Sequence, residues 1–183
     1  MLAPTFSRIT VDSIEPEIYR GIIHSWCAQR EGHAVPRKEK IDPFLVPALA
    51  ANLILYEVAG RDLIFRVLGE KVVTTVGTSL KGRTLRGALG ESDYVLMIER
   101  QLHECADSGV PLYSIHDFQL PEGEFAATTH SRKAWRIALP YSEEGRVTRL
   151  LCYQLFSQAI EPPFQKDIDF AGLLPKTVFK VEV

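Results

Sequence analysis

The chain has 183 residues, 46% of them hydrophobic, which suits one domain with a substantial core. Its 21 lysines and arginines and 23 acidic residues give a formal net charge of -2, and no basic run predicts a nucleic-acid partner. The N-terminus lacks a signal-peptide pattern, and the most apolar stretch, residues 44–58, is interrupted by Pro47 and Asn52. We therefore expect a cytoplasmic protein without a membrane partner. The three cysteines lie far apart and predict neither a disulfide framework nor a CxxC pair.

Apolar residues at helical spacing near the N-terminus predict a first helix between Ile14 and Cys27. A second, short helix is expected to restart at Asp42 and Pro43, because an aspartate side chain accepts free amides of a first turn and proline loses nothing there. Pro47 is expected to keep that helix short.

The middle and end of the chain read mostly as β-structure. Two runs, Leu53–Val58 and Leu63–Leu68, flank the glycine-containing turn AGRD and predict a hairpin. Three later runs, 111–120, 132–141 and 146–158, predict further strands. Between these two groups, residues 92–108 carry one apolar stripe, end at Gly109 and predict a long crossover helix.

The stretch between the hairpin and the long helix contains GxxxxGRT, from Gly77 to Thr84, which lacks the lysine of a phosphate-binding loop. Gly87 and Gly90 follow, so we expect no helix to start cleanly at Thr84. The glycines are better interpreted as points where the backbone reverses.

A set of residues in a fixed order resembles a known family. They are Trp26, Arg30, Pro36, Arg37, Asp42, Pro43, Arg66, Gly69, Gly77 and Gly82. Their order and spacing resemble the single-domain PAS-type proteins of bacteria, over residues 26–158. The resemblance implies an α+β fold in which a five-stranded antiparallel sheet, with helices over one face, encloses a small cavity. We expect a helical extension at 1–35, the PAS-like domain at 36–158 and a tail at 159–183.

The implied cavity would lie between the long helix and the sheet. Its expected ligand-binding residues are Arg66, Tyr94, Ile98, Leu102, His116, Trp135, Cys152 and Gln154. Both alternating sets on the later strands are partly apolar, so the sequence leaves open which set faces inward. Arg66 has two interpretations: an ion pair or carbonyl contacts that tie the sheet together, or a planar fork that holds a ligand carboxylate or phosphate.

PAS-type domains bind different cofactors, and each cofactor needs its own residues. Covalent flavin chemistry is excluded, because residues 65–92 contain no cysteine. The helical wheel also argues against haem, since His103 turns away from the stripe of Ile98 and Leu102 towards Glu99. No histidine pair has metal-ligand spacing, and the cofactor stays unassigned.

The sequence offers no local signature of a catalytic centre, and GxSxG is absent. The leading hypothesis is a stand-alone sensory module that binds a small ligand and acts through contacts with a separate signalling protein. A ligand-free interaction or scaffold module is the alternative, and an enzyme of unknown type is the third hypothesis.

The termini raise two further expectations. Ile14, Ile18, Ile22 and Trp26 form an apolar stripe, which is expected to pair with a second copy in a homodimer or to pack on the chain's own sheet. Near the C-terminus, apolar and charged residues alternate in 179–183, so this end predicts a docked edge strand or, equally, a frayed terminus.

Overall fold

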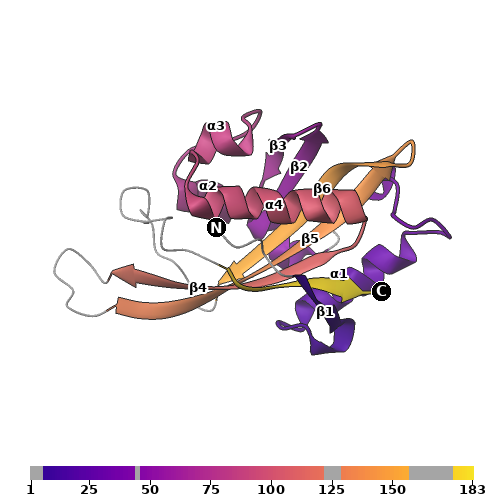
Figure 1. Ribbon diagram of the computed structural model, residues 1–183, viewed down its shortest axis with the longest axis horizontal. Coiled ribbons are helices and arrows are strands. Elements are labelled where there is room, and N and C mark those ends of the chain that lie inside the picture. Colours follow the sequence, from indigo (N-terminus) through magenta and orange to yellow (C-terminus); the bar gives the residue numbers. More distant parts are fainter. Residues whose placement is uncertain (1–5, 44–45, 122–128, 157–174) are drawn as a thin grey trace.

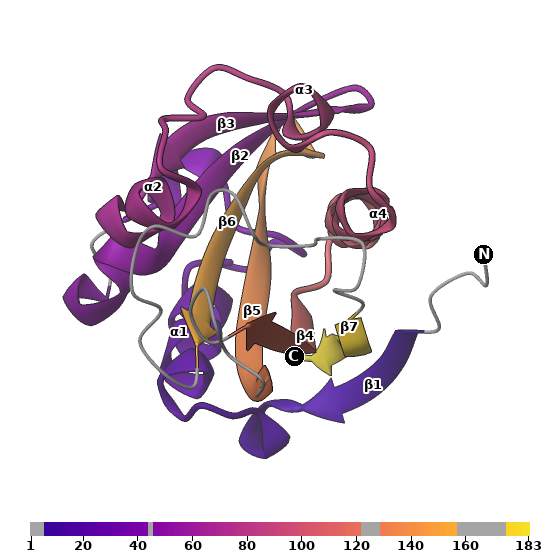
Figure 2. The same ribbon diagram turned by 90° about the vertical axis from the view of Figure 1, so that its left-hand side faces the viewer.

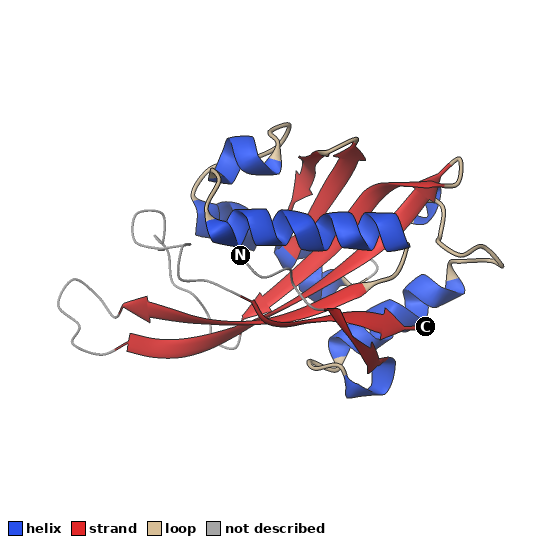
Figure 3. Ribbon diagram, in the orientation of Figure 1, coloured by secondary structure: helices blue, strands red, loops and turns tan. Residues whose placement is uncertain are grey.

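The computed structural model describes residues 6–43, 46–121, 129–156 and 175–183, which form one sheet flanked by helices (Figure 1). The strands are β1 (Phe6–Thr10), β2 (Leu53–Ala59), β3 (Asp62–Leu68), β4 (Leu112–Pro121), β5 (Thr129–Glu143), β6 (Arg146–Phe156) and β7 (Pro175–Glu182). The helices are α1 (Ile18–Ala28), α2 (Glu70–Val76), α3 (Leu85–Leu89) and α4 (Asp93–Ser108), with 3-10 turns at Val11–Ser13, Lys38–Lys40 and Pro47–Asn52. The α+β fold class is confirmed (Figure 3).

The strand order is β1-β7-β4-β5-β6-β2-β3, and all neighbours are antiparallel except β1 and β7. The five expected strands form the contiguous block β4-β5-β6-β2-β3, with the predicted hairpin at one edge. The expectation of five strands is corrected to seven, because β7 pairs with the outer side of β4 and β1 pairs with β7. These additions satisfy backbone groups that the edge of β4 would otherwise expose.

Helices cover both faces of the sheet, whereas the resemblance implied one (Figure 2). α1 packs on one face and α2, α3 and α4 on the other, so each face has its own core. The α1 core includes Tyr19, Ile22, Ile23, Trp26, Tyr113, Ile137, Leu139, Tyr141, Leu151 and Tyr153. The α4 core includes Tyr56, Leu63, Phe65, Leu85, Val95, Ile98, Leu102, Cys105, Leu150 and Cys152.

The N-terminal stripe is buried within its own chain. Ile14, Ile22 and Trp26 are almost fully buried in the α1 core, and Ile18 packs against it. Trp26 Nε1 also donates a hydrogen bond to the Pro140 carbonyl at 2.8 Å. The assignment of this stripe to a dimer interface is therefore corrected, because these side chains are already covered by β5 and its neighbours.

Local expectations for the N-terminal half of the chain are also corrected. The first helix begins at Ile18, four residues later than predicted. Pro47 begins a 3-10 turn, where its missing amide costs nothing, instead of ending a helix restarted at Asp42 and Pro43. Residues 44 and 45 lie outside the described part.

The glycine-rich stretch forms two short helices. Gly77 ends α2 with a φ of 71°, a left-handed conformation that glycine adopts readily. Thr84, however, does cap a helix, because its side-chain oxygen accepts a hydrogen bond from the Gly87 amide at 3.1 Å. The expectation that no helix starts there is wrong, since one good cap offsets the glycine within α3.

Gly69 marks a close backbone approach at the end of β3. A Cβ at this position would lie 2.4 Å from the Ala51 carbonyl carbon, and the Gly69 amide donates to the Leu53 carbonyl at 2.8 Å. The hairpin can therefore return beside the Pro47–Asn52 turn only with glycine at this position.

The C-terminal strand is docked, as one of the two sequence alternatives predicts. Val178 and Phe179 pair with Ser114 and Tyr113 of β4, and Val178 and Val181 are buried. The segment between β6 and β7, residues 157–174, lies outside the described residues. Among the helices that the structure describes, none is long and apolar enough to cross a membrane.

Candidate functional site beneath helix α4

The register of the central strands decides which side chains face α4. Leu150 and Cys152 of β6 and Ala138 of β5 belong to the α4 core, whereas Ile137 and Tyr153 belong to the α1 core. Because side chains alternate along a strand, the α4 face also receives polar residues that share this parity. Among them are Ser114 and His116 of β4, Arg136 of β5 and Gln154 of β6.

Arg136 lies at the centre of this polar group. Its Nη2 donates to Gln154 Oε1 at 2.8 Å and to Tyr94 Oη of α4 at 3.2 Å. The residue retains some exposed surface, but its Nη1 is fully buried and has no hydrogen-bond partner among the described residues. Nη2 of the guanidinium is thus held in place by two hydrogen bonds, while the N–H groups of Nη1 have no acceptor among the described residues.

His116 lies beside this guanidinium and is only 4% exposed. Its ring meets the Tyr94 ring edge-on, with centroids 6.1 Å apart, and its Nε2 is 2.8 Å from Ser114 Oγ. Its Nδ1 is buried without a partner in the part of the chain that the structure describes. Two unsatisfied polar atoms therefore belong to neighbouring side chains.

The site contains a positive charge, on Arg136, that is largely shielded from solvent. Burial, followed by the charge of Arg136, holds the pKa of His116 well below its usual value, so the imidazole is neutral at pH 7. Burial raises the pKa of Cys152 to about 12, although Arg136 opposes that rise. No carboxylate of the described residues forms an ion pair with Arg136, in contrast to most buried charges.

The same face of the sheet also carries the apolar α4 core. Ile98 and Leu102 of α4 are at most 3% exposed and pack on the sheet in this core, together with Cys105. Gln101 of the same helix is also buried, and its Nε2 has no partner within the described residues. The α4 face thus combines a tight apolar cover with incompletely satisfied polar atoms.

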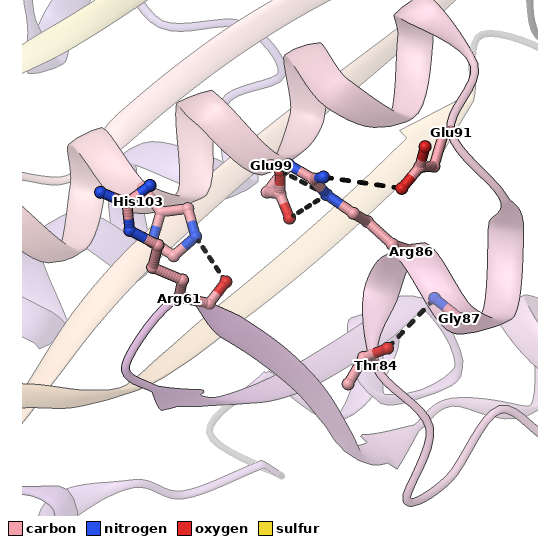
Figure 4. A network of polar contacts seen from close by, with 7 residues as sticks. All are labelled: Arg61, Thr84, Arg86, Gly87, Glu91, Glu99 and His103. Atoms are coloured by element: carbon pink, nitrogen blue, oxygen red, sulfur yellow. Dashed lines mark hydrogen bonds and ion pairs between the residues drawn. The ribbon is translucent and has the colours of Figure 1, made fainter.

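Two further contacts fix the position of α4 (Figure 4). Arg86 reaches from α3 and donates from Nε to Glu99 Oε1 at 2.8 Å, while its Nη1 lies 3.6 Å from Glu91 Oε1. One turn farther along α4, His103 Nε2 lies 3.2 Å from the Arg61 carbonyl in the β2–β3 turn. His103 does turn away from the buried stripe, as predicted, but it contacts the hairpin. These links join the helix over the site to α3 and to the edge of the sheet.

The structure brings together six of the eight expected ligand-binding residues. Tyr94, His116, Cys152 and Gln154 lie on the α4 face, and Ile98 and Leu102 form part of its apolar cover. Trp135 lies on the opposite face, where it packs against the α1 core. The placement of Trp135 in a cavity under α4 is therefore corrected by the strand register.

Arg66 also lies away from this site. Its Nε donates to Glu57 Oε2 of the neighbouring strand at 2.6 Å, and its side chain is 44% exposed. Arg149 lies 3.4 Å from the same carboxylate. The ion-pair interpretation of Arg66 is the one that the structure supports, with Glu57 of the neighbouring strand as the partner.

Arg136 and Ser114 are the members of the site that the sequence analysis missed. Arg136 interrupts an otherwise apolar strand, AWRIALPY, and a charge in such a run is the signal that was available. Ser114 carries no comparable signal, because serine is common at half-buried strand positions. In the described residues, no group of three or more histidine, cysteine or acidic side chains could hold a metal ion.

A family model described as a PAS domain matches residues 15–125 of the chain. Among solved structures, the chain is similar to an RNA-binding light-oxygen-voltage receptor, with 17% identity, a TM-score of 0.39 and coverage of 66% of this chain. The chain spans 35% of that receptor. It is also similar to a light-oxygen-voltage domain studied with a flavin analogue, with 20% identity, a TM-score of 0.38 and coverage of 64% of this chain and 87% of that one. No curated protein matches the chain.

Proposed function

The chain belongs to the PAS domain family, and we propose that it is a sensory module that binds a small ligand beneath α4 and signals through protein contacts. The observation that carries this proposal is the pair of buried, unpartnered polar atoms on Arg136 and His116. Such atoms cost free energy in a folded protein unless a partner is supplied, and a bound ligand is one way to supply it.

The route from ligand to partner would run through α4. Tyr94 connects this helix to Arg136, while Glu99 and His103 connect it to α3 and to the hairpin. A ligand that changed the contacts of Tyr94 would therefore bias the position of elements at the surface. A separate signalling protein, or a second copy of the chain, would read that change.

Native mass spectrometry of the protein purified without added ligand tests the proposal. We expect a mass excess that disappears under denaturing conditions and is absent from Arg136→Met. Light scattering on the same samples would show whether the protein is a dimer and whether its assembly differs between the loaded and the stripped forms.

A ligand-free scaffold is the second candidate function. It is favoured by the tight burial of Ile98, Leu102 and Cys105, because a helix that packs this closely on its sheet needs no ligand to complete the fold. Absence of any bound mass, together with no thermal shift against a panel of small molecules, would support the scaffold and reject the sensor.

A further inference from the structure

We propose that the site beneath α4 takes a small monocarboxylate, whose two oxygens accept hydrogen bonds from Arg136 Nη1 and His116 Nδ1. This inference rests on the proposed function and adds the chemical class of the ligand. It is carried by three properties of the site: a guanidinium with no acidic partner among the described residues, two buried donors without a partner there, and the apolar core on the same face of the sheet.

The charge argues for an anion. Arg136 stays protonated in proteins, and its only hydrogen bonds that the described residues provide run from Nη2 to the neutral groups of Gln154 and Tyr94. A shielded positive charge without a negative partner is unfavourable, and an anionic ligand would remove that cost. The planar fork of arginine also matches the geometry of a carboxylate.

The histidine argues for an acceptor with two oxygens. If Ser114 Oγ donates to His116 Nε2, the neutral imidazole carries its proton on Nδ1, the atom that lacks a partner. That tautomer leaves a second buried donor on a side chain that, like Arg136, contacts Tyr94. A carboxylate can then accept one hydrogen bond from each residue, whereas a chloride ion or a single water oxygen would have to be shared.

The surroundings argue for a small ligand with one charge. Ile98, Leu102 and Cys105 are buried in the apolar core beneath the same helix, and neither Arg136 Nη1 nor His116 Nδ1 is open to solvent. A large or doubly charged group would have to bury a further charge among these apolar side chains. Formate, acetate and propionate therefore represent the expected class, and entry to the site requires α4 to move.

The first test is a thermal-shift and calorimetric titration of the full chain with sodium formate, acetate and propionate. Formamide, acetamide and propionamide serve as neutral isosteres, and sodium chloride and sodium phosphate serve as ionic controls. We expect the carboxylates to raise Tm in the millimolar range and the amides and chloride to have no effect. Loss of the charge-assisted bonds in Arg136→Met should weaken binding at least about tenfold.

The matched control is Arg66→Met, which removes an exposed arginine from the opposite face and should bind as the wild type does. Equal responses to a carboxylate and its amide, or equal losses in the two arginine variants, would overturn the inference. Binding of phosphate without binding of carboxylates would also overturn it, in favour of a different anion.

The second test uses the wild type alone, so it does not depend on the folding of a variant. The Cε1–H resonance of His116 is followed by NMR against pH, with and without acetate. A bound carboxylate favours the imidazolium, so acetate should raise the pKa of His116 from its lowered value. An unchanged titration in saturating acetate would reject the contact with His116.

The outcomes separate this inference from the proposed function. If neutral molecules bind beneath α4 and carboxylates do not, the sensor stands and the carboxylate is wrong. If native mass spectrometry and the titrations find no ligand at all, both are wrong.

Discussion

The two faces of the sheet treat their buried polar groups differently. On the α1 face, Tyr19 Oη donates to the Trp135 and Tyr153 carbonyls at 2.9 and 3.0 Å, and Trp26 Nε1 donates to the Pro140 carbonyl. These groups are neutral and satisfied by backbone oxygens, although Tyr153 Oη has no partner in the described part of the chain. On the α4 face, a shielded guanidinium and a buried imidazole retain unused donors.

The buried polar groups of the two faces are therefore expected to affect the free energy of unfolding differently. Neutral side-chain donors on backbone acceptors lock α1 to the strands. We expect the charged, partly satisfied group beneath α4 to lower the stability of the free protein, because a shielded charge without an acidic partner among the described residues is costly. Substitutions on the two faces are therefore expected to change stability in opposite directions.

Removal of the indole from the α1 face should have the largest effect. Trp26→Ala deletes a side chain that is 1% exposed and leaves the Pro140 carbonyl without its donor, so we expect a loss of about 3–5 kcal/mol in unfolding free energy. Urea denaturation measures it. Val67→Ala, at an exposed position, is the control, and a loss as small as that of the control would show that α1 is not a main source of stability.

Replacement of the arginine on the α4 face should act in the opposite direction. Arg136→Met removes a shielded charge that has no acidic partner in the described residues, so we expect the ligand-free protein to gain about 1–2 kcal/mol in unfolding free energy. Urea denaturation of dialysed protein measures it, with Arg66→Met as the matched control. A clear loss of stability would mean that the bonds to Tyr94 and Gln154 make Arg136 a structural residue.

His116 should make the stability of the protein depend on pH. Its pKa is lowered in the folded state, so below about pH 6.5 the unfolded chain binds a proton that the folded chain does not. Stability therefore falls as the pH falls. Between pH 7.0 and 5.5, the wild type should lose about 1 kcal/mol more than His116→Gln. Equal losses in the two proteins would show that His116 accepts a proton without unfolding.

The smallest effect should come from the links that hold α4. Glu99→Gln removes the negative charge of α4 that pairs with Arg86, and we expect faster amide hydrogen exchange in α4 with little change in α1. Mass spectrometry of peptides from the two helices measures it. An equal acceleration in both helices would indicate global destabilisation and would contradict an independent response of the α4 face.

The elements that sequence reasoning predicted well are those with local signals. Alternation in β2 and β3 around a glycine turn, and the stripe from Tyr94 to Cys105 ahead of Gly109, each arise from neighbouring residues in the chain. The errors arose where a local signal was weak or overruled. Thr84 caps a short helix despite two nearby glycines, and β1 has only five residues.

The candidate site was only partly predictable for a different reason. Tyr94, His116 and Gln154 could be proposed from their place on a helix and two strands, but nothing in the sequence says whether Trp135 or Arg136 is the residue that faces α4. That choice depends on how β5 pairs with β4 and β6, since a shift of one residue would exchange the two faces.

The sequence by itself thus determined the order and type of most elements, because periodicity and turn residues act over a few positions. Only the tertiary structure decided that the N-terminal stripe is buried in its own chain, that β1 and β7 extend the sheet, and that Arg136 lies beneath α4. Those outcomes depend on contacts between segments far apart in the chain, and such contacts are set by strand register and by the area each face must cover.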